Sequence, residues 1–166
     1  MTITTSVFGG TALSSYGGFW ISIGIILIPG GFNIQKSYAS TGDFYTVFGF
    51  YIFGWFIFTF LLWLCTLRST LFFSSLFAMV WLSFLCLAIG YLDAQTNGTG
   101  MPNVALTKAG GAFGMVAGFL AWWLMLAGLL EPGNSFFLVP VFHFPWSDKG
   151  REARRADKVE DDGEVV

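Results

Sequence analysis

Charged side chains are scarce in this sequence and unevenly placed along it. Asp, Glu, Lys and Arg make up 11% of the 166 residues, whereas a typical soluble domain has about a quarter. Up to Leu130 the ionisable acids and bases are Lys36, Asp43, Arg68, Asp93 and Lys108. No acid falls in the middle of an apolar block, so a proton relay of membrane-embedded carboxylates has no residues from which to form.

Histidine and cysteine are equally rare. The single histidine, His143, follows the last apolar block. The apolar blocks therefore lack the residues for a metal site of His and carboxylate ligands. Cys65 and Cys86 lie inside apolar blocks, which predicts packing thiols rather than a disulfide. No glycine-rich phosphate loop precedes a Lys-Ser/Thr pair. We expect no enzymatic activity, no cofactor, no metal and no nucleic-acid partner.

Apolar residues dominate what is present. They form 55% of the chain, aromatic residues form 19%, and the mean hydropathy is +0.68. Four apolar blocks, each close to the roughly 20 residues that cross a bilayer as a helix, cover residues 8–28, 45–65, 71–92 and 109–130. The sequence predicts an all-α polytopic membrane protein with four transmembrane helices, in contact with the lipid bilayer. Its membrane domain is predicted over residues 1–146, followed by a disordered, charged, cytoplasmic tail over 147–166.

The distribution of Lys and Arg predicts the orientation. Lys149, Arg151, Arg154, Arg155 and Lys158 lie in the tail, and the positive-inside rule places that end of the fourth block in the cytoplasm. Counting back through the blocks places Arg68 inside and the segments around Lys36 and Lys108 outside. Both termini are then cytoplasmic.

A stripe of small residues runs along the fourth block. Gly110, Gly114 and Gly118 are spaced four residues apart, which puts them on one face of a helix. Such a face lets two helix backbones approach closely in lipid, within one subunit or between subunits. The alternative is a smooth face that lines a pore. We favour helix packing.

Two further residues have two interpretations each. Tyr16 opens the first block between Ser14, Ser15, Gly17 and Gly18, where it is either an interfacial belt tyrosine or a residue with room for a solute. Lys108, at the head of the fourth block, either extends outward to the headgroups or attracts anions to an outer mouth.

Several phrases in one colinear order then indicate a family. They are Ser6-Val-Phe-Gly-Gly-Thr-Ala-Leu-Ser-Ser-Tyr-Gly-Gly-Phe-Trp20, Trp55-Phe-Ile-Phe-Thr-Phe-Leu-Leu62, Thr66-Leu-Arg68, Leu87-Ala-Ile-Gly90, Lys108-Ala-Gly-Gly-Ala-Phe-Gly114 and Ser135-Phe-Phe-Leu-Val-Pro-Val141. Together they resemble the acetate uptake transporter family, which includes bacterial succinate-acetate permeases and fungal plasma membrane proteins for acetate and ammonia export. The phrases with Tyr16 and with Lys108 look fungal.

The resemblance implies a six-helix subunit in a hexamer, with a monocarboxylate path that narrows at a hydrophobic constriction. In the family this constriction is formed by a Phe of the first helix, the Tyr that maps onto Tyr16, and an aliphatic residue that maps onto Val80. The Asn-Pro-Ala-Pro-Leu-Gly-Leu signature of the first helix is absent, so the four blocks resemble the last four helices. We therefore expect an N-terminally truncated member.

The predicted function is transport of small monocarboxylates, chiefly acetate, alone or with a proton, across the plasma membrane. An ammonium exporter of the same family is one alternative, because the phrases do not separate the two substrates. The other is a four-span membrane scaffold without a transport path, for which the glycine stripe alone would suffice.

Overall fold

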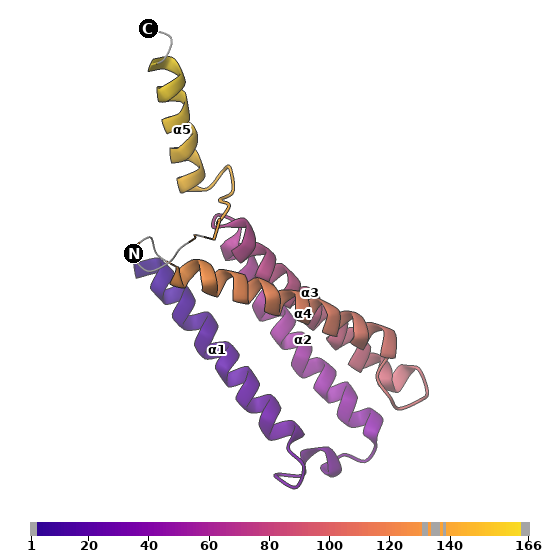
Figure 1. Cartoon of the computed structure of the whole chain (residues 1–166). Coiled ribbons are helices and arrows are strands. Elements are labelled where there is room, and N and C mark those ends of the chain that lie inside the picture. The colour runs from indigo at the N-terminus through magenta and orange to yellow at the C-terminus, as the bar shows by residue number, and fades with distance from the viewer. Residues whose placement is uncertain (1–2, 131–132, 134–136, 138, 164–166) are drawn as a thin grey trace.

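Four long helices joined by short connections form the body of the computed structural model, and a fifth, polar helix follows them (Figure 1). The structure describes residues 3–130, 133, 137 and 139–163. The long helices are α1 (Ile3–Leu27), α2 (Thr41–Thr66), α3 (Leu71–Thr96) and α4 (Val104–Leu129), and a short 3-10 helix, η1 (Ile34–Ser37), precedes α2. All four are long and apolar enough to cross a membrane. The predicted all-α class and the four apolar helices are confirmed.

Capping residues extend three of these helices beyond the apolar blocks. Ser40 accepts a hydrogen bond from the backbone N–H of Asp43, so α2 begins four residues before its apolar block. Asn103 accepts hydrogen bonds from the N–H groups of Ala105 and Leu106, so α4 begins at Val104 rather than at 109. At the end of α3 the backbone N–H of the cap residue Asn97 donates to the Asp93 carbonyl, so α3 continues four residues past its apolar block. Hydrophobicity detects only the part of a helix that lies in lipid. The first and last turns of these helices are polar and extend beyond that part.

Helices α2, α3 and α4 approach each other closely at glycines. A Cβ atom added to Gly49 of α2 would lie 2.9 Å from the backbone nitrogen of Leu92 in α3. A Cβ atom at Gly90 of α3 would lie 3.1 Å from the Cβ of Leu106 in α4. These are backbone approaches that only a small residue permits in a lipid environment, where packing rather than the hydrophobic effect drives helix association.

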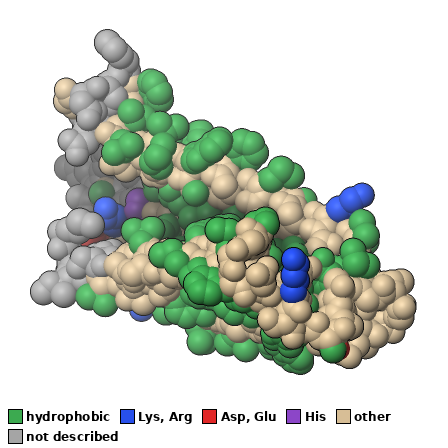
Figure 2. Space-filling model, turned by 90° about the horizontal axis from the view of Figure 1, so that it is seen from below, with side chains coloured by type: hydrophobic (Ala, Val, Ile, Leu, Met, Phe, Trp, Pro, Cys, Tyr) green, Lys and Arg blue, Asp and Glu red, His purple; other side chains and the backbone are tan. Residues whose placement is uncertain are grey.

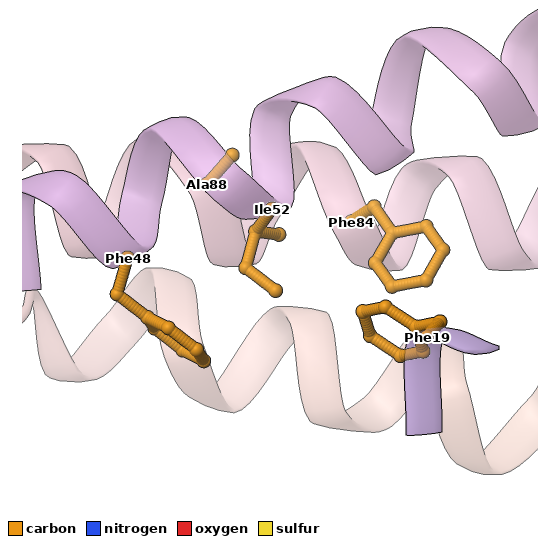
Figure 3. Packing of buried hydrophobic residues seen from close by; sticks show 5 residues of the cluster. All are labelled: Phe19, Phe48, Ile52, Phe84 and Ala88. Carbon is orange, nitrogen blue, oxygen red and sulfur yellow. The ribbon is translucent and has the colours of Figure 1, made fainter. Parts of the chain in front are cut away.

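Helix α1 joins this group through its side chains. All five of its glycines would meet no neighbour within 4 Å with a Cβ added: Gly9, Gly10, Gly17, Gly18 and Gly24. Its Phe19 is 4% exposed and packs with Phe84 of α3 in the buried cluster, which also contains Phe48, Ile52 and Ala88 (Figure 3). Helix α1 is thus attached by large side chains, in contrast to the close backbone packing of α2, α3 and α4.

Large hydrophobic side chains cover much of the outer surface. Leu13, Phe50, Leu61, Met115 and Phe119 are each more than half exposed, and hydrophobic side chains spread along the helices on the face seen in Figure 2, where Lys and Arg are few. Such a surface is expected of helices whose solvent is lipid rather than water.

Most of the segment predicted to be a disordered tail, 147–166, is helical instead, as α5 (Asp148–Gly163), and 164–166 lie outside the described residues. Ser147 caps the helix, because its hydroxyl accepts a hydrogen bond of 3.1 Å from the Gly150 N–H and its carbonyl accepts the Arg151 N–H. Arg151 forms an ion pair with Asp148 one turn away. The local support for this helix comes from the Ser147 cap and from this one ion pair.

The root of α5 is tied to the turn between α2 and α3. The Leu71 N–H donates to the Phe142 carbonyl at 2.8 Å, and the indole Nε1–H of Trp146 donates to the Leu67 carbonyl at 2.8 Å. Thr70 and His143 form a β-bridge beside these bonds. The segment from Phe142 to Trp146 is therefore fixed at one end of the helix bundle, from which α5 projects (Figure 1).

Candidate functional site

Tyr16 points its hydroxyl at a buried threonine on the neighbouring helix. The Tyr16 Oη donates a hydrogen bond of 2.9 Å to Oγ1 of Thr59, a residue of α2 that is completely buried. The tyrosine ring contacts Trp55, Phe58 and Phe77, with ring centroids 6.2–6.4 Å apart. The hydrogen bond and the surrounding rings fix the orientation of Tyr16, so its position is more restrained than that of a belt tyrosine at an interface.

The Tyr16 ring forms part of the wall of a half-open cavity between α1 and α3, which we name the α1–α3 cavity; Leu13 and Trp20 at its rim are more than half exposed. Its volume is about 420 Å³, and Val80 lies on its α3 side. The remaining lining residues are Phe8, Gly9, Ala12, Leu13, Phe19, Trp20, Phe73, Leu76, Phe77 and Phe84. The structure thus brings together Tyr16 and Val80, the two residues that the sequence predicted for a constriction.

The lining of this cavity is apolar and aromatic. No charged side chain is among its lining residues, and Tyr16 is the one lining residue with a hydroxyl group, which is directed at Thr59 of α2. Because the Tyr16 O–H is donated to Thr59, the phenolic oxygen keeps lone pairs that can accept a hydrogen bond. Burying an ionised carboxylate without a charged partner is costly, so the cavity suits a small solute in its neutral form.

A second space adjoins it, which we name the four-helix groove. It has a volume of about 790 Å³ and is lined by residues of all four long helices. Phe19, Trp20, Leu76, Val80 and Phe84 line both spaces. Val80 therefore lies where the two spaces meet, which is where a constriction between them would form.

The structure divides the glycine stripe of α4 into three environments. A Cβ atom at Gly110 would lie 2.7 Å from Cγ of Leu87 and 3.1 Å from the Ser83 carbonyl oxygen, so this glycine packs against α3. A Cβ atom at Gly114 would lie 3.4 Å from the Ser83 hydroxyl, an ordinary contact. Gly118 has no neighbour within 4 Å and lines the four-helix groove, as Gly114 also does. Helix packing describes the geometry at Gly110, and the smooth-wall alternative describes it at Gly118.

Lys108 lies apart from these spaces. It is exposed in the second turn of α4 and lines neither the α1–α3 cavity nor the four-helix groove. The structure therefore does not bring Lys108 together with Tyr16 and Val80. Attraction of anions to an outer mouth stays a prediction for this residue.

Sequence reasoning missed the hydroxyl groups that join α1 to α2. Besides Thr59, these are Ser22 and Tyr51, whose hydroxyl oxygens are 2.5 Å apart. Ser22 and Thr59 are hydroxyl residues in the interior of apolar blocks. This position in the sequence could have indicated hydrogen bonds between helices, because such groups hydrogen-bond across helices in lipid. Which tyrosines they meet follows only from the packing.

Known proteins resemble this chain over most of its length. The sequence profile described as the GPR1/FUN34/yaaH family matches residues 1–146. The protein named "Acetate permease A" of Emericella nidulans is 52% identical over 159 residues, which cover 93% of this chain and 53% of that protein. "Ammonia transport outward protein 2" of Saccharomyces cerevisiae is 42% identical over 145 residues, which cover 87% of this chain and 48% of that protein.

"Glyoxylate pathway regulator" of Yarrowia lipolytica is 41% identical over 139 residues, which cover 84% of this chain and 48% of that protein. The chain spans about half the length of the curated relatives it matches. The match to the family profile extends over the four apolar helices and all the phrases that carried the resemblance in the sequence. The chain belongs to the GPR1/FUN34/yaaH family.

Proposed function

We propose that this chain forms part of a membrane path for small monocarboxylates, acetate first. The observation that carries the proposal is the placement of Tyr16 and Val80 on the wall of one apolar cavity. A relative that is 52% identical is named as an acetate permease, which supports the choice of solute. A scaffold protein needs helix packing alone, whereas this chain also has two adjoining spaces among its helices.

The chemistry of the cavity favours the protonated acid over the carboxylate. Acetic acid has one O–H group, which the free lone pairs of the Tyr16 oxygen can accept, and a methyl group that fits the aromatic walls. The proton then travels on the solute, so the described helices need no carboxylate or histidine relay. Hydrated ions are disfavoured, because the apolar walls offer no replacement for their water.

Outward movement of ammonia is the second candidate function. It is favoured by the names of two relatives, "Ammonia transport outward protein 2" and "Ammonia transport outward protein 3" of Saccharomyces cerevisiae. Neutral ammonia could also donate a hydrogen bond to the Tyr16 oxygen, so both candidates use the same cavity. The two candidates predict different inhibitors of acetate uptake.

The proposal extends to location and assembly. We propose the plasma membrane by resemblance to the family, and we propose that both termini are cytoplasmic, because the bases at the root of α5 and Arg68 lie at the same end of the bundle. We propose a homo-oligomer, a hexamer by resemblance to the family. Gly10, Gly17 and Gly24 of α1 line neither space and have no neighbour within 4 Å of an added Cβ atom, so they offer an open face for such contacts.

The proposal is tested with a chimera in which this chain replaces the matching half of Acetate permease A. The chimera and the parent permease are reconstituted in vesicles, and uptake of radiolabelled acetate is measured. We expect saturable uptake that increases as the outside is acidified and that unlabelled propionate inhibits. Inhibition by ammonium and not by propionate would favour the second candidate. Absence of acetate uptake in the chimera, with a working parent, would contradict the proposal.

A further inference from the structure

The charges of α5 are sorted along its length. Its first half, residues 148–156, has four bases and two acids, whereas residues 157–163 have one base and four acids. The bases of the first half are Lys149, Arg151, Arg154 and Arg155. The half of α5 next to the helix bundle is therefore positive, and the far half is negative.

This order opposes the electrostatics of a helix. The N-terminal end of a helix carries a partial positive charge and is stabilised by acids, and the C-terminal end is stabilised by bases. In α5 most bases lie near the N-terminus and most acids near the C-terminus. The charge order thus lowers the stability of α5, so it does not serve helix formation and points to an external anionic partner.

The root of α5 lies at the edge of the apolar bundle. Trp146 and Phe142, two residues that tie the root to the α2–α3 turn, are 54% and 57% exposed. Exposed aromatic rings at the end of membrane-spanning helices are typical of the headgroup level of a bilayer. Arg68, exposed in the same turn, adds a further base at this level.

Most of these bases are available to an outside partner. Among the described side chains, Arg151 is paired with the carboxylate of Asp148. Arg154 donates to the backbone carbonyls of Gly150 and Pro145 rather than to an acid. Lys149 and Arg155 are exposed. The root therefore presents several positive charges within two helical turns.

The bases of α5 lie nearer to the bundle than most of its acids. With a rise of about 1.5 Å per residue, Lys149 to Arg155 lie within about 12 Å of the cap residue Ser147. Asp148 and Glu152 lie in the same stretch and leave residues 148–156 with a net charge of +2, whereas residues 157–163, farther along the helix, have a net charge of −3. A negatively charged membrane surface would attract the root and leave the acidic half standing away from it.

We propose that the basic root of α5, together with Arg68, binds the anionic phospholipid headgroups of the adjoining leaflet. The partner is argued from charge complementarity and from the position of the root at the end of the apolar helices. The acidic half keeps α5 projecting from the surface instead of lying on it. The proposal rests on the proposed membrane orientation, since the cytoplasmic leaflet is the one rich in such lipids.

The test uses the full chain in nanodiscs, which expose both leaflets, so binding is measured whatever the orientation in a cell and without any transport assay. Hydrogen exchange of residues 148–156 and 157–163 is compared in discs of phosphatidylcholine and in discs with about 30% phosphatidylserine. We expect slower exchange of the first segment in the anionic discs, reversed by high salt. The second segment should exchange equally in both.

Two variants sharpen this test. Replacing Arg151, Arg154 and Arg155 together by Gln should abolish the difference between the discs, because each base near the surface changes the ratio of bound to free root by about fivefold, and three change it on the order of 100-fold. The matched variant with Lys at these three positions keeps the charge and should retain the difference in exchange between the two kinds of disc.

Equal exchange in both kinds of disc, or an unchanged difference in the Gln variant, would overturn the proposal. An equal slowing by soluble polyphosphate in phosphatidylcholine discs would show a general polyanion site and overturn the assignment to headgroups.

Discussion

Gly110→Ala is the substitution whose effect follows most directly from the packing of α3 and α4. The added Cβ atom would lie 2.7 Å from Cγ of Leu87, 3.0 Å from Cδ2 of the same residue and 3.1 Å from the Ser83 carbonyl oxygen. Carbon atoms in contact prefer a separation of about 3.5–4.0 Å. The leucine side chain can move, but the Ser83 carbonyl is backbone, so the two helices have to separate.

The expected loss of stability combines two contributions. Inserting a methyl group into a packed interface costs about 1–3 kcal/mol. Separation of the helices also weakens the hydrogen bond of 2.7 Å from the Ser83 hydroxyl to the Gly110 carbonyl, and such bonds in membrane proteins average about 0.6 kcal/mol. The sum is about 1.5–3.5 kcal/mol, which lowers the melting temperature of a chain of this size by roughly 3–14 °C.

The assay is thermal unfolding of the purified chain in detergent, with Gly118→Ala as the matched control. A Cβ atom at Gly118 meets no neighbour within 4 Å, so the control should be as stable as the original protein or more stable by up to about 1 kcal/mol, because alanine favours a helix interior over glycine. If Gly110→Ala and Gly118→Ala unfold at the same temperature as the original chain, the close approach of α3 and α4 is refuted.

Three further predictions concern the site, the tail and the orientation. Thr59→Val and Tyr16→Phe should each destabilise the chain. A double-mutant cycle in detergent should give a coupling energy of about 0.6 kcal/mol, and at most about 1.7 kcal/mol, for the hydrogen bond between them. Additive effects of the two substitutions would mean that this hydrogen bond does not form. Ser147→Ala should speed hydrogen exchange in the first turn of α5, since losing a cap costs about 0.5–2 kcal/mol, and unchanged exchange would contradict the cap. Single cysteines in a cysteine-free background should be labelled from outside intact cells at Lys36 and not at Arg154, and the reverse pattern would contradict the orientation.

The helices could be predicted because lipid imposes a simple rule on the sequence. A segment in the bilayer has to be apolar and helical over about 20 residues, and the four blocks meet this condition. The helix ends could not be placed from hydrophobicity, because caps such as Ser40 and Asn103 act in the polar layers. The helical α5 was missed for a related reason: its support comes from the Ser147 cap and an ion pair, not from an apolar face.

The candidate site could be predicted only in part. The resemblance supplied Tyr16 and Val80, which lie far apart in the sequence and share one cavity in the structure. Thr59 could not be paired with Tyr16, because the residue that meets a hydroxyl depends on the rotation of α1 against α2. The spacing of Gly110 and Gly118 on one stripe likewise does not show that α3 covers only one of them.

The most direct test of the proposed path is the selectivity of Tyr16→Ala in the chimera. The measurement is the ratio of butyrate to acetate uptake in vesicles at equal protein abundance, with Tyr38→Ala as the control, because Tyr38 packs against Phe44 and neither residue lines a described space. Removing the Tyr16 ring widens the α1–α3 cavity, so the ratio should rise in this variant and stay unchanged in the control. An unchanged ratio in Tyr16→Ala would contradict a monocarboxylate path past this residue.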